Sequence, residues 1–415
     1  MNGFASFFAR RIGARRGAAA STRTGVVIAV AGVALALAVM ELTLCIVTGF
    51  KSEIRRKVMG FQAPVSVTAP YDVETGHTAA EFVLTPGLRR LVDGRLPAGA
   101  RSVVTLRRPA IIKTDGDFAA VEVVSRGPGH DPAFEEGNLL RGRLPQGCAG
   151  GRDSIVISRS LARKLGLDTA ARPYVFFFVD GEVRTRRATV GGVYCSDFSD
   201  YDDNIVYGSP ALAAAGRPEL VTSLDIEGVP EGEIMPLADT LQARLVQAYR
   251  AGTLPELHPV ETVYQSGAMY FNWLELLDTN VVVIFVLMLC VAGFTLVSSL
   301  FIIILDRMST IGLLRALGAT TGTVAGIFVR VAMRLVGAGM VIGNVLGLGL
   351  ALLQDATHLL PLDPGMYYLP YVPVQVDWWA MGALNLGTAL AAWLILILPA
   401  RLASRVQPGA VMRYE

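Results

Sequence analysis

One stretch of the chain runs for 25 residues without a charged side chain: VVVIFVLMLCVAGFTLVSSLFIIIL, from Val281 to Leu305. A helix needs about 20 consecutive apolar residues to cross the hydrocarbon core of a bilayer. Three other stretches meet the same requirement, at 25–48, 335–353 and 378–398. The sequence therefore predicts four transmembrane helices, the second of them at 279–305.

The composition of the whole chain is that of a membrane protein. Of the 415 residues, 52% are hydrophobic and 17% are charged, whereas a soluble domain carries about 25% charged residues. The mean hydropathy is +0.47. These values exclude a disordered chain and a nucleic-acid-binding protein.

The basic residues predict how the chain crosses the membrane, because Lys and Arg collect in cytoplasmic loops. Five arginines and no acid precede the first predicted span, and the connection 306–334 has four arginines and one Asp. The loop 354–377 has three Asp and no basic residue. We therefore expect both termini (1–24 and 399–415) and the connection 306–334 to be cytoplasmic. Residues 49–278 and 354–377 are expected on the other side.

The sequence just outside the spans adds two expectations. Aromatic residues before the second and fourth spans, Tyr270 and Tyr368 among them, are typical of a belt at the membrane interface. In 1–24, Phe4, Phe7, Phe8 and Ile12 are spaced for one helical face with arginines on the other. That pattern predicts an amphipathic helix at the cytoplasmic interface. The alternative is a cleaved presequence.

The long insert between the first two spans has the texture of a soluble α+β domain. It holds 25 of the 37 basic and 29 of the 35 acidic residues. Alternating runs predict strands, and two other segments predict helices at 158–165 and 237–249. The predicted strands are 64–68, 102–106, 119–124, 154–157, 174–179 and 189–193. The fold class is thus a helical membrane protein in a 1+3 layout, with an α+β domain inserted after helix 1.

Signatures of catalysis are absent from the sequence. It contains no Gly-x-x-x-x-Gly-Lys-[Ser/Thr] loop for nucleotide phosphates, no His-Glu-x-x-His and no Gly-x-Ser-x-Gly. The four histidines are scattered, so we expect no metal site and no catalytic residue. Clustered acids at Asp197, Asp200, Asp202 and Asp203 are compatible with a cation site, but we expect a solvated loop. Cys148 and Cys195 allow either a disulfide or two unpaired thiols.

Two features within the spans go beyond what anchoring requires. Glu41 is an intramembrane charge, and acids within a span usually face protein or water. Its alternative place is near the outer surface, where water would hydrate it. Gly339, Gly343 and Gly347 are four residues apart and predict a helix-packing face, either within the bundle or between protomers.

The connection after the second span predicts a short, partly apolar helix rather than a plain loop. Its sequence from Asp306 to Thr320 is DRMSTIGLLRALGAT. Such a helix is suited to lie in the groove of another protein.

This stretch, with ILPAR near 398 and VMRYE at the end, resembles FtsX-like permeases, the membrane subunits of MacB-type ABC transporters. The GFK sequence at Gly49 and the LDPGMYY sequence at Leu362 are most similar to permeases of the lipoprotein-releasing LolC/LolE type. The resemblance covers essentially the whole chain.

The resemblance implies a multi-pass protein of the bacterial inner membrane with a periplasmic insert. The expected partners are cytosolic ATPases that carry the ATP and Mg, a second permease, identical or homologous, that forms a dimer, lipoprotein cargo, and a periplasmic carrier. No cofactor is expected on this chain. The expected ATPase-coupling residues are Arg307, Met308, Ile311, Gly312, Leu313, Leu314, Arg315, Ala316, Leu317 and Gly318.

The implied activity is extraction of lipoproteins from the outer leaflet, which pass to the carrier without crossing a channel. Seven apolar residues are candidates for the groove that holds the acyl chains: Val33, Leu37, Met40, Leu44, Val283, Leu287 and Phe294. Two other functions of such permeases stay open. One is efflux of amphiphilic drugs or peptides from the periplasm, and the other is control of a cell-wall hydrolase.

Overall fold

The computed structural model describes residues 20–72, 77–78, 81–145, 153–179 and 182–403. These residues form two compact units. The helical unit consists of Met1–Ser52, Trp273–Pro361 and Tyr371–Glu415, so far as they are described. The second unit consists of Glu53–Asn272 together with Leu362–Pro370. The predicted helix within 1–24 and most of the tail 399–415 lie outside the described residues.

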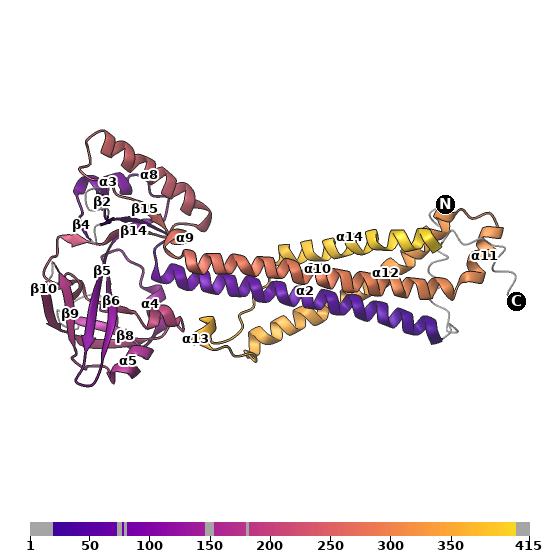
Figure 1. The fold of residues 1–415 in the computed structure, drawn as a ribbon, viewed down its shortest axis with the longest axis horizontal. Helices are drawn as coiled ribbons and strands as arrows, with labels where there is room; N and C mark the ends of the chain where they lie inside the picture. Colours follow the sequence, from indigo (N-terminus) through magenta and orange to yellow (C-terminus); the bar gives the residue numbers. More distant parts are fainter. Residues whose placement is uncertain (1–19, 73–76, 79–80, 146–152, 180–181, 404–415) are drawn as a thin grey trace. The chain divides into compact units, whose positions relative to one another are not determined.

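Four helices are long and apolar enough to cross a membrane, as the sequence predicted. They are α2 (Ala20–Phe61), α10 (Ala268–Leu305), α12 (Thr321–Thr357) and α14 (Trp378–Ala403) (Figure 1). Three of them extend well beyond the predicted spans: α2 continues past 48, α10 begins before 279, and α12 begins 14 residues before 335. Hydropathy detects only the apolar part of a helix. The predicted spans are therefore shorter than these helices, which continue into more polar sequence.

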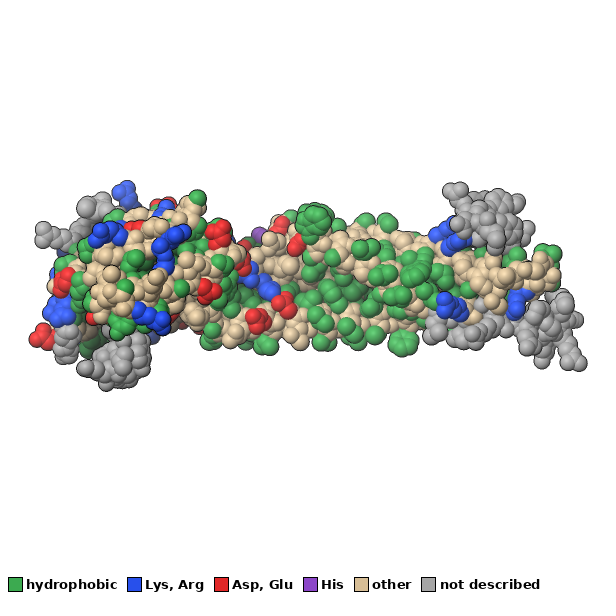
Figure 2. Space-filling view, turned by 90° about the horizontal axis from the view of Figure 1, so that it is seen from above, with side chains coloured by type: hydrophobic (Ala, Val, Ile, Leu, Met, Phe, Trp, Pro, Cys, Tyr) green, Lys and Arg blue, Asp and Glu red, His purple; other side chains and the backbone are tan. Residues whose placement is uncertain are grey.

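The helical unit has its own apolar core, built from all four long helices. Ala29, Leu300, Phe328 and Leu396 are each at most 5% exposed and belong to one buried cluster. Many large apolar side chains of the same helices face outward, and Figure 2 shows hydrophobic groups over much of their surface. An outside as apolar as the inside is expected for helices surrounded by lipid.

The six predicted strands of the insert are all present, together with shorter ones. They are β1 (Val65–Thr68), β5 (Arg101–Lys113), β6 (Phe118–Arg126), β8 (Ser154–Ser158), β9 (Tyr174–Val179) and β11 (Thr189–Tyr194). The others are β2 (Tyr71–Asp72), β3 (His77–Thr78), β4 (Phe82–Val83), β7 (Leu139–Gly142), β10 (Glu182–Arg187), β12 (Ile205–Gly208), β13 (Leu220–Val221), β14 (Ser223–Glu227) and β15 (Val260–Thr262). The insert is therefore an α+β domain, as expected.

Both predicted helices of the insert are also present, as α5 (Arg159–Leu165) and α8 (Ile234–Arg250). The Ser158 hydroxyl caps α5 by accepting from the amide of Leu161. The remaining short helices are α3 (Pro86–Asp93), α4 (Ala133–Asn138), α6 (Ser199–Asp202), α7 (Pro210–Ala213), η1 (Glu231–Glu233), α9 (Val263–Ser266), α11 (Met308–Ala316) and α13 (Pro364–Tyr367).

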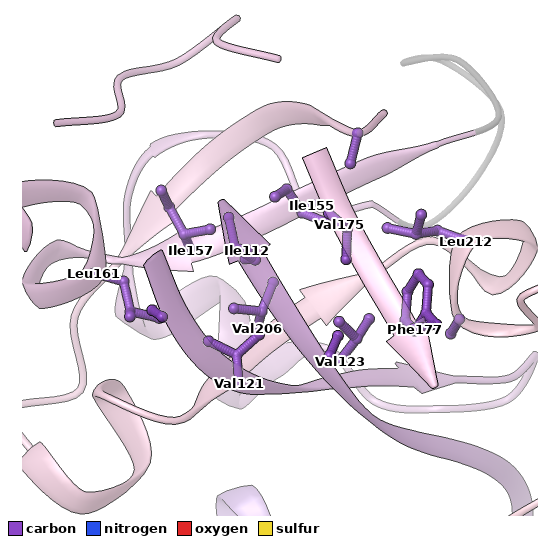
Figure 3. Close-up of a cluster of buried hydrophobic side chains, with 14 of the residues drawn as sticks. Ile112, Val121, Val123, Ile155, Ile157, Leu161, Val175, Phe177, Val206 and Leu212 are labelled. Atoms are coloured by element: carbon purple, nitrogen blue, oxygen red, sulfur yellow. The ribbon is translucent and has the colours of Figure 1, made fainter. Parts of the chain in front are cut away.

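The main sheet has the order β15-β1-β14-β5-β6-β12-β8-β11-β7. Strand β5 is long enough to pair with β6 along one edge and with two strands along the other. Its first half pairs with β14 and its second half with β9, which in turn pairs with β10. In Figure 3 the side chains of Ile112, Val123, Ile155 and Phe177 converge with Leu161 of α5 and Leu212 of α7. This core joins β5, β6, β8, β9, β11 and β12 to the two short helices.

Candidate functional site

The predicted coupling segment forms a short helix between two long ones. Helix α10 ends at Leu305, α11 occupies Met308–Ala316, and α12 begins after Thr320, whose hydroxyl accepts from the amide of Thr323. Gly318 has a φ of +90°, a backbone conformation that other residues rarely adopt. The chain therefore reverses direction through α11 with a fixed turn on its C-terminal side.

The two sides of α11 differ in burial. Ile311 is 3% exposed and packs in the core cluster of the helical unit, with Met308 partly buried beside it. Leu313 and Leu317 lie one turn apart on the outer side and are 62% and 76% exposed. Ile311 was predicted among the residues that meet a partner. The structure corrects this, since a buried side chain anchors α11 and offers no surface to another protein.

The other predicted coupling residues lie on or beside the outer surface of α11. Ala316 and Gly318 are exposed, whereas Arg307, Gly312, Leu314 and Arg315 are half-buried. The segment therefore presents a small, mixed surface with Leu313 and Leu317 as its largest apolar groups.

Glu41 lies inside the helical unit and is fully buried. Its Oε1 accepts a hydrogen bond of 3.2 Å from the amide of Asn385 on α14. Asn385 in turn exchanges hydrogen bonds of 2.8 and 3.1 Å with Asn344 on α12. Of the two alternatives for Glu41, the structure supports the one in which it faces protein. The three side chains tie α2, α12 and α14 together.

The glycine stripe of α12 packs against α2 within the chain. A Cβ added at Gly339 would lie 2.9 Å from the carbonyl oxygen of Val30, and one at Gly343 would lie 2.9 Å from that of Ala34. At Gly347 the added atom would lie 2.6 Å from Oε2 of Glu41. The absence of side chains at these three positions is what lets the two backbones approach so closely.

The residues proposed for an acyl-chain groove do not share one surface. Val33, Leu37 and Met40 of α2 are at most 2% exposed, and Val33 and Leu37 lie against the glycine stripe; Leu44 is half-buried. Val283, Leu287 and Phe294 of α10 are 61%, 56% and 76% exposed. This corrects the prediction for the three buried residues, because side chains that are at most 2% exposed offer no surface to a lipid. The α10 residues remain candidates.

The acidic cluster at 197–203 is solvated only in part: Asp200 and Asp203 are exposed, as a solvated loop predicts, whereas Asp202 at the end of α6 is buried. Asp202 is 5% exposed and accepts hydrogen bonds from the amide and hydroxyl of Ser196. Burial raises the pKa of Asp202 to about 6, against the lowering effect of these hydrogen bonds. No group of three or more potential metal-ligating side chains occurs among the residues that the structure describes.

A contact that the sequence did not indicate joins this cluster to the loop between α12 and α14. The hydroxyls of Tyr270 and Tyr368 both donate to Oδ2 of Asp200, each at 3.0 Å. Buried Lys57 donates to the carbonyls of Ser196 and Tyr368 at 2.5 and 2.9 Å. Both rings therefore pack in the second unit, and their expected place in a belt at the membrane interface stays a prediction. The LDPGMYY sequence at Leu362 was the signal available for this contact, but it does not indicate which residues Tyr368 contacts.

Cys195 is half-buried, and its thiol donates to Oδ1 of Asp197 at 3.3 Å. Cys148 lies outside the described residues. The predicted alternatives for this pair therefore stay open.

Part of the helical unit matches a known family. Residues 282–408 match the FtsX-like permease C-terminal domain. This chain carries an FtsX-like permease domain. It begins within α10 and includes α11, α12, the following loop and α14, and so contains the coupling segment and the glycine stripe.

Curated relatives similar to this chain include two that cover nearly its whole length. It is 23% identical over 413 residues to the lipoprotein-releasing system transmembrane protein LolC of Xylella fastidiosa (strain Temecula1), covering 92% of each chain. It is 25% identical to LolC of Neisseria meningitidis serogroup B over 412 residues, 94% of each. With LolE of Haemophilus influenzae it shares 24% identity over 205 residues, 47% of each.

Two solved structures similar to part of this chain are extracytoplasmic domains. One is the extracellular domain of the noncanonic ABC-type transporter YknZ from Gram-positive bacteria, with a TM-score of 0.32 and 14% identity, covering 48% of this chain and 100% of that one. The other is the periplasmic region of MacB from Actinobacillus actinomycetemcomitans, with a TM-score of 0.32 and 12% identity, covering 52% and 95%.

Proposed function

We propose that this chain is the permease subunit of an ATP-driven complex that releases lipoproteins from the bacterial inner membrane. One observation carries the proposal, which is the similarity to relatives named as lipoprotein-releasing proteins over 92–94% of both lengths. The proposal includes cytoplasmic termini and a periplasmic insert. The distribution of arginines and aspartates around the spans supports that orientation.

ATP hydrolysis is assigned to a separate cytosolic subunit, because the sequence lacks the glycine-rich lysine loop that holds nucleotide phosphates. We assign its docking surface to the outer side of α11. Leu313 and Leu317 would enter a groove of the ATPase, while Ile311 holds the helix against the bundle. Movement of the ATPase would then pass directly to α10 and α12.

Lipoprotein release needs a shielded path, because each lipid methylene moved from the bilayer into water costs about 0.8 kcal/mol. In the proposed complex, Val283, Leu287 and Phe294 of α10 form one wall of that path. A second permease, identical or homologous, forms the other wall. Closing of the ATPases narrows the path and transfers the acyl chains to a periplasmic carrier.

Depletion of the chain in its own bacterium tests the cargo. We expect lipoproteins destined for the outer membrane to remain in the inner membrane, which cell fractionation and immunoblotting would measure. Normal lipoprotein sorting with increased drug sensitivity would instead support efflux. A cell-wall hydrolase captured by the insert, again with normal sorting, would support control of that hydrolase.

The coupling surface is tested by substitution of Leu313 in the full complex. Leu313→Glu places a charge in the proposed apolar contact, so we expect at least a tenfold loss of ATPase co-purification. Leu313→Met keeps the contact apolar and serves as the matched control. Equal co-purification and equal stimulated ATP hydrolysis for both variants would reject the assignment of α11 as the docking helix.

A further inference from the structure

A cavity of about 580 Å³ lies between α12 and α14 in the helical unit. Its α12 side consists of two neighbouring rows at helical spacing: Thr321, Ala325 and Val329, and Gly322, Gly326 and Arg330. Its α14 side is the single row Trp393, Ile397 and Arg401. The volume is in the range of sites that hold small molecules, about 300–1,000 Å³.

The small residues of α12 are what keep this cavity open. A Cβ added at Gly322 or Gly326 would meet no atom of another element within 4 Å. This distinguishes them from Gly339 and Gly343, whose missing side chains let α2 pack closely. The two glycines therefore leave space that no other described part of the chain fills.

The chemistry of the lining is divided between charge and hydrocarbon. Arg330 and Arg401 supply two guanidinium groups, and none of the described residues that line the cavity is acidic. Val329, Ile397 and the half-exposed ring of Trp393 supply apolar surface. Trp393 precedes Arg401 by two helical turns on one face of α14, so the apolar and the charged parts lie at different depths along the helix.

We propose that this cavity binds an anionic phospholipid. The guanidinium groups of Arg330 and Arg401 match a phosphate in charge and geometry. An acyl chain would lie along Val329, Ile397 and Trp393. Basic cavities between membrane helices recognise lipid headgroups by this combination. The site differs from the proposed lipoprotein path, because it lies on α12 and α14 and not on α10.

A lipid fits the cavity better than a soluble anion or a protein segment does. A soluble anion would make no contact with the apolar residues Val329, Ile397 and Trp393. Both helices that form the cavity are also long and apolar enough to span a membrane. An acidic peptide would leave Trp393 and Ile397 uncovered toward the hydrocarbon. The two arginines flank the predicted spans 335–353 and 378–398, where phosphates of the adjoining leaflet are found.

Native mass spectrometry of the purified full-length chain tests the proposal. Phosphatidylglycerol and phosphatidylcholine with identical acyl chains are titrated separately. We expect phosphatidylglycerol to bind at least fivefold more tightly, and Arg330→Gln to remove most of that preference, since each basic residue contributes about a factor of five. Arg334→Gln is the matched control, because Arg334 is an exposed arginine one turn further along α12 that does not line the cavity.

A second variant tests the space independently of the charge. Gly326→Phe places a ring in the cavity from a position where an added Cβ meets no atom of another element within 4 Å, and it should lower phosphatidylglycerol binding at least fivefold while both arginines remain. Equal binding of the two lipids to the unmodified chain would overturn the proposal. So would equal losses in Arg330→Gln and Arg334→Gln, or loss of ATPase co-purification in Arg330→Gln with unchanged lipid binding.

Discussion

The ring of Tyr368 stacks on the ring of Phe198, with centroids 4.5 Å apart and planes 12° from parallel. Phe198 belongs to the long insert, whereas Tyr368 lies in the loop that follows α12, so the contact joins parts of the chain that are far apart in sequence. The stack is reinforced by the Tyr368 hydroxyl, which donates to Asp200, and by Lys57, which donates to the Tyr368 carbonyl. Residues 362–370 thus belong to the same compact unit as the insert.

Removal of the Tyr368 ring should release this loop segment. Tyr368→Ala removes an aromatic pair, which contributes about 0.5–1.5 kcal/mol, and a hydrogen bond to a carboxylate, which contributes about 1.5–3 kcal/mol. We expect faster hydrogen exchange at the amides of Leu362 and Tyr367, measured by mass spectrometry on the full-length chain. Tyr367→Ala removes a ring that is 41% exposed, and it should leave the exchange nearly unchanged. Equal exchange in the two variants would contradict the docking role of Tyr368.

Close packing of α12 on α2 predicts a strong position dependence for glycine substitutions. A Cβ at Gly343 would lie 3.0 Å from the Cβ of Leu37, whereas one at Gly349 would meet no atom of another element within 4 Å. Gly343→Leu should therefore destabilise the bundle by about 1–3 kcal/mol, since overpacked side chains force backbone shifts. Gly349→Leu should have little effect. Thermal unfolding of both variants in the same detergent measures the difference, and similar midpoints would contradict the packing role.

The polar cluster of buried Glu41 with half-buried Asn344 and Asn385 predicts a loss of stability when its central member, Asn385, is removed. Asn385→Leu removes the donor that Oε1 of Glu41 and Oδ1 of Asn344 share, and losing such a partner costs about 1–3 kcal/mol per buried group; Nδ2 of Asn344 keeps its bond to the carbonyl of Met340. Leu386→Ala, at the neighbouring and exposed position of α14, is the control. A thermal midpoint that falls no further in Asn385→Leu than in the control would show that the cluster does not hold the helices together.

Local sequence patterns predicted the parts of this fold that depend on neighbouring residues. Long uncharged runs predicted four apolar helices, and alternation predicted six strands, including 154–157, where the structure has β8 (Ser154–Ser158). Each of these features depends only on the residues of one segment, through the spacing of its apolar residues or the length of its uncharged run. The span boundaries were less accurate, because the polar turns at the helix ends have no counterpart in hydropathy.

Contacts between distant residues were not predictable in this way. An acidic cluster has the local appearance of a solvated loop, but the amide and hydroxyl of Ser196 offset the desolvation of Asp202. Ile311 resembles its apolar neighbours on α11, and only the packing of α10 and α12 around it distinguishes anchor from docking surface. The predicted groove residues do not share one surface for the same reason: a contact between distant residues decides their burial, since Val33 and Leu37 lie against glycines of another helix.

A buried charge cluster in the insert predicts that stability depends on pH. The Nδ1 atom of His130 lies 2.6 Å from Oε1 of Glu227, and its Nε2 atom lies 3.1 Å from Oε1 of Glu135. Arg126 donates to the same Glu135 oxygen at 3.1 Å. Burial lowers the pKa of His130, but the hydrogen bonds to the two carboxylates outweigh it, so the pKa lies above its usual 6.5.

Because the folded-state pKa of His130 is raised, the protonated ring stabilises the folded chain. This contribution is complete below about pH 6.5, the value for an exposed histidine, and is lost as the pH rises through the higher folded-state pKa. His130→Gln keeps a hydrogen-bonding side chain but cannot take up the proton. The thermal midpoint of the full-length chain should therefore exceed that of His130→Gln by more at pH 5.5 than at pH 8.5. A difference that stays constant between these two pH values would show that His130 is not protonated between Glu135 and Glu227.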